Sequence, residues 1–145
     1  MAKGYPDFYG FSVFPKIGPV VDDTVAPLAV PTDVLTTVHN VVGKGEIVGG
    51  HLRFMGGVDY TTTRLVLIID GDTAIDQLVM RMWYAYAFQP DCGPLFITSI
   101  NVVTHMLAIA FTRGITFEQS YQMQVFHSEG ADRDVYSSVF YTRIL

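Results

Sequence analysis

The segment 115–128, ITFEQSYQMQVFHS, alternates between apolar and polar side chains and constrains the fold more than any other stretch. Its odd-numbered positions are mostly apolar and its even-numbered positions mostly polar, which is typical of a strand with one buried and one solvated face. At about 3.3 Å per residue the segment would span roughly 40–45 Å, which is long for one strand. We therefore expect a bend or bulge inside it, with Gln119 as the candidate position because it interrupts the apolar face.

Other segments also carry strand signals. The β-branched run 34–42 ends at the turn Gly43-Lys44-Gly45 and is followed by 46–55, so the two runs predict a hairpin. Gly49-Gly50 inside the second run indicates a bulge or a close approach of two backbones. The run 61–69 is apolar on both faces from Leu65 onward, as expected of a central strand covered on both sides. Further strands are expected over 95–101, 102–112 and 135–145.

Residues 73–88 fit two descriptions. The helical spacing i, i+3, i+4, i+7 and i+11 is met by Ile75, Leu78, Val79, Met82 and Tyr86. Thr73 and Asp76 together resemble a capping box, whereas the aromatic residues after Met82 favour extended chain. We predict a helix over 74–84, with extended chain after it.

Short strands at this spacing, with one short helix, predict a mainly β protein. The expected fold is an antiparallel β-sandwich or jelly-roll-like barrel over residues 32–145. Residues 1–31 hold five of the seven prolines, which disfavour regular helix and central strands, so we expect them to form an extended arm. The arm is also rich in aromatic side chains, at Tyr5, Phe8, Tyr9, Phe11 and Phe14. Two placements stay open, one on its own domain and one on a neighbouring subunit.

Composition bears on partners. Hydrophobic residues make up 50% of the chain and charged residues 16%, against roughly 25% charged in an ordinary soluble domain. We expect a homo-oligomer that buries apolar surface, the alternative being an unusually apolar monomer. The net charge is −5 and the basic residues are scattered, so we expect no direct nucleic-acid binding. No apolar run approaches the roughly 20 residues of a membrane helix, and the N-terminus lacks a signal-peptide pattern, which predicts a soluble protein made in the cytoplasm.

Motifs of chemistry are sparse, and we expect neither catalysis nor a cofactor. Asp70 and Asp72 are only weak candidates for a metal site, because the calcium-loop pattern is absent and turn formation and helix capping account for them better. The four histidines lack metal-ligand spacing, although they could converge across strands. Cys92 has no basic neighbour to activate it, and Glu118 is a single carboxylate on a wet face. A small hydrolase with an unrecognised site ranks last among the alternatives.

Aromatic residues near the predicted helix suggest a second class of function. Trp83, Tyr84 and Tyr86 could offer flat faces to a sugar, in which case the protein would be a carbohydrate-binding sandwich. The competing interpretation places these rings in the core or at a subunit interface.

From about Gly45 onward, the order of features resembles that of jelly-roll structural proteins of viral and bacteriophage particles. The features concerned are a Gly-rich strand ending in RFM, the run RLVLIIDGD, the strand FEQSYQMQVFHS and the closing VYSSVFYTRIL. The resemblance implies a capsid, decoration or tail component in the virion, made in the host cytoplasm and without catalytic activity. Its partners would be copies of itself and other virion proteins, contacted through the arm aromatics.

Overall fold

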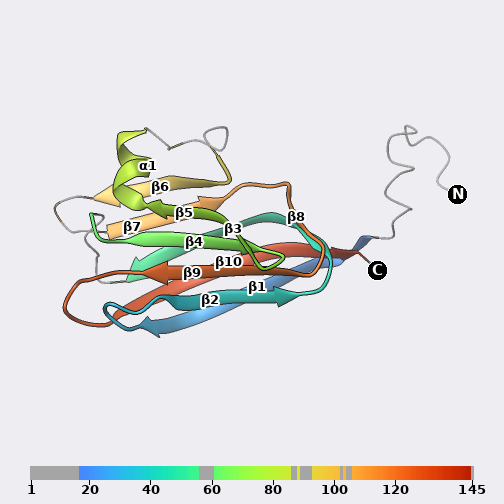
Figure 1. Ribbon diagram of the computed structural model, residues 1–145, viewed down its shortest axis with the longest axis horizontal. Helices are drawn as coiled ribbons and strands as arrows, with labels where there is room; N and C mark the ends of the chain where they lie inside the picture. Colours follow the sequence, from blue (N-terminus) through green and yellow to red (C-terminus); the bar gives the residue numbers. More distant parts are fainter. Residues whose placement is uncertain are drawn as a thin grey trace, which may run out of the picture.

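In the computed structural model the chain forms two antiparallel β-sheets packed face to face, with one short helix (Figure 1). The structure describes residues 17–55, 61–85, 88, 93–101, 103 and 106–144. The strands are β1 (Ile17–Val30), β2 (Thr36–Val42), β3 (Gly45–Met55), β4 (Arg64–Ile69), β5 (Asp72–Leu78), β6 (Leu95–Asn101), β7 (Met106–Phe111), β8 (Ile115–Phe117), β9 (Ser120–Phe126) and β10 (Arg133–Ile144), and the helix is α1 (Val79–Tyr84).

The strand order is that of a jelly roll. A six-stranded sheet has the order β1-β10-β3-β7-β6, with β8 also paired to β3, and a four-stranded sheet has the order β2-β9-β4-β5. The pairs are nested: β1 pairs with β10, β2 with β9, β3 with β7 and β8, and β4 with β5. A long antiparallel ribbon rolled into two sheets produces this nesting. The predicted antiparallel sandwich with one short helix is confirmed.

The alternating segment 115–128 is divided between the two sheets. Its first part is β8 on the six-stranded sheet and its second part is β9 in the four-stranded sheet. The chain crosses between them at Glu118 and Gln119, both exposed, so the predicted bend at Gln119 is confirmed. The expected inward side chains Phe117, Tyr121 and Met123 are buried. One sequence pattern therefore supplies both halves of the core.

The predicted hairpin between 34–42 and 46–55 is wrong. β2 belongs to the four-stranded sheet and β3 to the six-stranded sheet, so the turn at Gly43 carries the chain from one sheet to the other. Both strands bury apolar side chains, and they present them to each other across the core rather than side by side. A glycine-containing turn specifies a reversal of the chain but not the partner of each strand.

The predicted helix over 74–84 is only partly right. Residues 72–78 form the edge strand β5, paired with β4, and the helix is limited to 79–84. The residue before the helix is Leu78, which makes no side-chain capping bond, and Asp76 instead pairs with Arg64 across the sheet. Ile75 and Leu78 match the spacing of an amphipathic helix. Few side chains of this edge strand point inward, so its apolar–polar alternation is too weak to outweigh the helical pattern.

The arm expected over residues 1–31 is half strand. Ile17–Val30 forms β1, which pairs along β10, so the sandwich includes residues 17–30 that the prediction assigned to the arm. This part lies on its own domain, which was one of the two placements left open. Its register is interrupted around both Pro19 and Pro27, and β1 is an edge strand, where the missing N–H of proline is tolerated. Residues 1–16, with all five arm aromatics, lie outside the described residues.

Different elements join the two sheets along the two sides of the sandwich. On one side α1 contacts β5 and β6, the edge strands of the two sheets (Figure 1). On the opposite side the edge strands β1 and β2 contact each other directly. We call this second side the β1–β2 seam. It contains the buried polar network described below.

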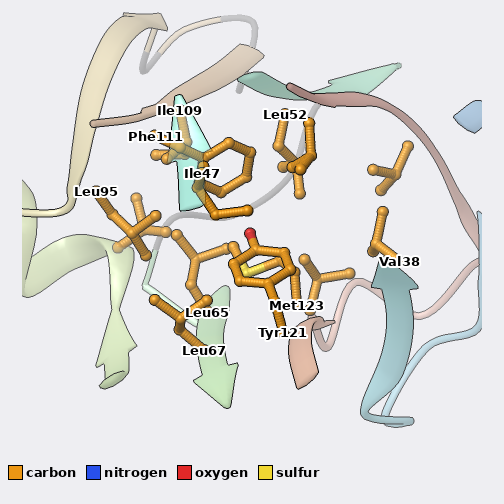
Figure 2. Close-up of a cluster of buried hydrophobic side chains, with 14 of the residues drawn as sticks. Val38, Ile47, Leu52, Leu65, Leu67, Leu95, Ile109, Phe111, Tyr121 and Met123 are labelled. Carbon is orange, nitrogen blue, oxygen red and sulfur yellow. The ribbon is translucent and has the colours of Figure 1, made fainter. Parts of the chain in front are cut away.

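The core between the sheets is apolar and draws on nearly every strand. Figure 2 shows side chains of this cluster, among them Val38, Ile47, Leu52, Leu65, Leu67, Leu95, Ile109, Phe111, Tyr121 and Met123. Leu65, Val66 and Leu67 are all buried, and β4 lies between β9 and β5, so the predicted central strand is confirmed, although Arg64 and Ile68 on its outer face stay partly exposed. The Tyr121 hydroxyl has no hydrogen-bond partner among the described residues, and burial raises its pKa.

Candidate functional site

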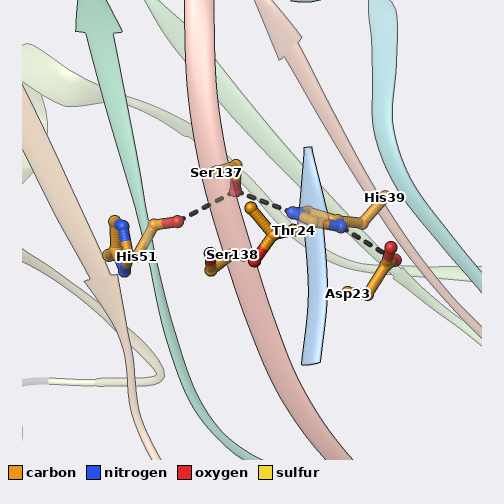
Figure 3. A network of polar contacts seen from close by, with 6 residues as sticks. All are labelled: Asp23, Thr24, His39, His51, Ser137 and Ser138. Carbon is orange, nitrogen blue, oxygen red and sulfur yellow. Dashed lines mark hydrogen bonds and ion pairs between the residues drawn. The ribbon is translucent and has the colours of Figure 1, made fainter. Parts of the chain in front are cut away.

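A polar network crosses the β1–β2 seam and joins three strands (Figure 3). His39 of β2 has Nδ1 3.1 Å from a carboxylate oxygen of Asp23 in β1. Its Nε2 lies 2.7 Å from the hydroxyl of Ser137 in β10. His39 is 1% exposed and Ser137 is fully buried, whereas the Asp23 side chain is 39% exposed. We refer to these three residues as the seam triad.

The network continues into the six-stranded sheet. The Ser137 hydroxyl donates a 2.9 Å hydrogen bond to the main-chain carbonyl of His51 in β3. On the other face of this sheet, the hydroxyls of Thr24 and Ser138 lie 2.7 Å apart, so β1 and β10 are also linked through side chains there. The polar groups of the seam are thus hydrogen-bonded to one another, as buried polar groups in proteins normally are.

Two opposing effects act on the pKa of the His39 imidazole. Burial lowers the pKa of His39, while the hydrogen bond and the negative charge of Asp23 act in the opposite direction. Burial is the larger effect, so the pKa of His39 lies below its ordinary value. A carboxylate can only accept, so Nδ1 of His39 carries a hydrogen and donates it to Asp23.

Asp, His and Ser at these distances match the residue types of a hydrolase triad, but the arrangement is reversed. In such enzymes the serine faces the substrate and the aspartate is buried behind the histidine. Here Ser137 is the buried member and its hydroxyl is bound to a main-chain carbonyl, whereas Asp23 reaches the surface. A nucleophile in this position meets no substrate. The seam triad instead links strands β1, β2 and β10 through hydrogen bonds.

Sequence reasoning missed this network. It weighed His39 by itself, because Asp23 and Ser137 lie 16 and 98 residues away along the chain. No local spacing rule links residues on three strands of two sheets. The only available signal was a histidine among β-branched residues in a strand, and that signal names no partner.

The other described histidines lie apart from His39. His127 is fully buried on the inward face, as predicted, and its Nε2 donates to the carbonyl of Val30 at 2.9 Å. His51 is exposed and its ring stacks on Tyr136, with centroids 6.0 Å apart. His105 and Cys92 lie outside the described residues. Within the described part of the chain, no three His, Cys, Asp or Glu side chains come together as a metal site would need.

The weak metal candidates Asp70 and Asp72 have separate places. The Asp70 carboxylate accepts hydrogen bonds of 2.6–3.0 Å from the main-chain N–H groups of Glu118, Gln119 and Ser120. It thereby holds the turn at which the chain crosses from β8 to β9. The N–H groups, that of Ser120 foremost, lower the pKa of Asp70. Asp72 is exposed at the start of β5. Glu118 forms an ion pair of 2.6 Å with Lys44.

Replacing Asp70 with alanine is expected to lower the melting temperature at neutral pH, because three N–H groups lose their acceptor. The folded pKa lies below the ordinary value of 3.8, so this stabilisation is present above that value and disappears as the pH falls through the lowered one. Wild type and Asp70→Ala should therefore melt at different temperatures at pH 7 and converge in strong acid. Asp72→Ala is the control, expected to melt like wild type. A constant difference at all pH values would contradict this assignment.

The candidate sugar-binding aromatics are arranged unevenly. Trp83 packs against the core and meets Phe88 edge-on, with ring centroids 5.3 Å apart. Tyr84, next to it at the end of α1, is 70% exposed. Tyr86 lies outside the described residues. Tyr84 is thus the one ring of the described pair that projects freely.

Comparison with known proteins adds no family to this picture: no family model matches the chain, and no curated protein matches its sequence. The helix α1 has six residues, and none of the described helical segments is long and apolar enough to cross a membrane.

Proposed function

We propose that this protein is a non-enzymatic structural subunit of a viral particle, assembling through its N-terminal segment and the aromatic side chains on one sheet face. The observation that carries the proposal is the nested jelly-roll pairing of its strands. This architecture is found in viral capsid domains, and also in lectins and cupins. Because architecture alone does not determine function, surface chemistry has to decide among these.

The outer face of the six-stranded sheet supports an assembly role. Its side chains include three partly exposed aromatic rings and two alanines, namely Phe96, Ala108, Ala110, Tyr136 and Phe140. The strand register places them on the outer face with His51 and Arg53, away from the core. Polar side chains such as Thr24, Glu46 and Thr116 share this face, and the aromatic rings among them are the groups that an interface would bury.

The outer face of the four-stranded sheet differs in character. Gln124 donates hydrogen bonds to Thr37 and Gln122, and Arg64 forms a two-pronged ion pair with Asp76. This face also carries Val42, which is 68% exposed, and the partly exposed Phe126. We assign the contacts with other subunits to the six-stranded sheet because it presents more aromatic rings.

The N-terminal segment supports the same role. Residues 1–16 continue from β1, an edge strand of the six-stranded sheet, and contain Tyr5, Phe8, Tyr9, Phe11 and Phe14. Aromatic rings bury large apolar areas and are enriched where proteins associate. We therefore assign the segment to contacts with a neighbouring subunit.

The test is the mass in solution, measured by light scattering on three proteins. These are the full chain, the chain without residues 1–16, and the full-length triple substitution of Phe8, Phe11 and Phe14 to serine. Truncation must stop at Lys16, because removing residues 1–31 would also delete β1 from the sheet. We expect a large assembly of the full chain and small species for both variants, with unchanged β-sheet circular dichroism. A 16.1 kDa monomer in all three cases would overturn self-assembly and favour ligand binding.

A further inference from the structure

One end of the sandwich exposes large apolar side chains. Strands β1, β3, β5, β6 and β9 all end there, and α1 lies at the same end (Figure 1). Among the described residues six large apolar side chains are exposed, and five of them belong to this end, namely Val34, Leu35, Met55, Tyr84 and Val103. We call these five residues the apolar end. Single exposed apolar side chains are common, but their concentration in one place marks a site of interaction.

The opposite end of the sandwich has a different character. Its turns carry the ion pair between Lys44 and Glu118, and β1 begins there while β10 ends there (Figure 1). The sixth exposed apolar side chain, Val42, lies near this end on the outer face of β2. The N-terminal segment therefore joins the sandwich at Ile17 on the polar end, and the apolar side chains are exposed at the other.

We propose that the apolar end of one copy of this chain is the docking site for the N-terminal segment, residues 1–16, of the next copy, so that copies join head to tail. This inference rests on the assembly role proposed above and names the surface that receives the segment. The aromatic rings on the six-stranded sheet are left for other contacts between subunits.

The length of the chain excludes docking of the segment on its own apolar end. β1 has 14 residues and spans roughly 43 Å at about 3.3 Å per residue, and the apolar end lies at the far end of this strand. The rings of Phe8, Phe11 and Phe14 precede Ile17 by nine residues at most, so they reach no more than about 32 Å from it. Only another copy can present an apolar end to these rings.

The dimensions of the segment and of its docking site agree. The six-stranded sheet sets β1, β10, β3, β7 and β6 side by side, which is roughly 19 Å across at about 4.8 Å between neighbours. An extended run from Tyr5 to Phe14 spans about 30 Å and holds all five aromatic rings of the segment. One segment can therefore contact apolar side chains across the whole width of the sheet. Aromatic rings bury large areas in such contacts.

The charges of the two surfaces are complementary. The segment contains Lys3 and Lys16 against the single acidic residue Asp7. Beside the apolar end, residues 31–35 and 127–134 contain four acidic side chains and one basic side chain, namely Asp33, Glu129, Asp132, Asp134 and Arg133. A net positive segment is attracted to this acidic rim, and such complementarity favours the correct pairing of surfaces.

Docking of this kind joins two different surfaces of the same chain. Each bound pair keeps one free N-terminal segment and one free apolar end, so further copies can be added in the same direction. Contacts between unlike surfaces produce a ring if the rotation between copies closes, and a filament if it does not. The inference therefore predicts an assembly in which all subunits point the same way.

Light scattering on full-length variants tests the docking. The apolar-end variant carries Leu35→Ser, Met55→Ser and Val103→Ser, and its matched control is Val42→Ser near the opposite end. The segment variant is the triple serine substitution described above. We expect small species for the apolar-end and segment variants, with unchanged circular dichroism, and wild-type assembly for Val42→Ser.

Mixing the two defective variants gives a sharper result. Together they offer one intact segment and one intact apolar end, so an equimolar mixture should form species of about twice the mass of either variant alone and nothing larger. A mixture that stays at the mass of the separate variants would overturn the proposal. Assembly of the apolar-end variant to the wild-type size would also overturn it, while leaving the assembly role in place.

A labelled peptide of residues 1–16, followed by fluorescence anisotropy, separates the docking from the assembly role. It should bind the segment variant, whose apolar end is intact. Adding the apolar-end substitutions should weaken binding at least tenfold, and adding Val42→Ser should not. Val103→Ser alone, at a residue that is 87% exposed, serves if the triple substitution does not fold, and it too should weaken binding.

The outcomes for docking and assembly are distinct. Peptide binding without assembly of the full chain would support the docking and count against the particle. Assembly of the full chain without peptide binding would overturn the docking alone. Binding of the segment variant to phosphatidylcholine vesicles in place of the peptide would overturn the proposal in favour of a lipid surface.

Discussion

Alanine at position 50 is expected to lower the free energy of unfolding by about 3 kcal/mol, a large fraction of the stability of a small domain. Gly50 lies in β3, between β10 and β7. An added Cβ would stand 2.5 Å from the main-chain oxygen of Ser138 and 2.7 Å from the Phe111 ring. The first of these atoms belongs to a paired strand and cannot rotate away. The close backbone approach indicated by Gly49-Gly50 is thus confirmed at the second glycine.

The neighbouring glycine provides a matched control. Gly49 has a φ of +159°, close to the +156° of Gly50, but an added Cβ there meets no atom within 4 Å. Denaturant unfolding of Gly49→Ala and Gly50→Ala therefore separates crowding from backbone conformation. We expect Gly49→Ala to lose well under half of what Gly50→Ala loses. Equal losses would show that conformation, and not the contact with Ser138 and Phe111, requires glycine in this strand.

Phenylalanine at position 121 is expected to raise the free energy of unfolding by about 1 kcal/mol, since a buried unpaired polar group costs about 1–3 kcal/mol. Tyr121 is fully buried in β9, and its hydroxyl lies among apolar side chains (Figure 2). No described residue bonds to that hydroxyl. The ring itself contacts Phe117, with centroids 6.2 Å apart, and this contact is kept in the variant.

Thermal and denaturant unfolding of Tyr121→Phe would measure this gain. Tyr136→Phe is the control, because Tyr136 is partly exposed on the outer face and its change should have little effect. A loss of stability in Tyr121→Phe would contradict the expectation. It would indicate that a buried water molecule bonds to the hydroxyl. Such a water needs at least two polar partners.

Local patterns in the sequence determined a good part of the fold. The alternation over 115–128 identified which side chains of β8 and β9 are buried, and the exception at Gln119 marked the crossing between sheets. The two-sided apolar run after Arg64 identified a central strand. These inferences hold because side-chain alternation and burial are properties of a single strand, and each can be read from consecutive residues.

Only the tertiary structure decided which strands are partners. It separated β2 from β3, made residues 72–78 an edge strand, and brought residues 17–30 into the sheet beside β10. The seam triad belongs to the same category, since Asp23, His39 and Ser137 meet only after the ribbon has rolled up. Pairing depends on the burial of distant segments against one another, and this energy has no signature within a short window of sequence.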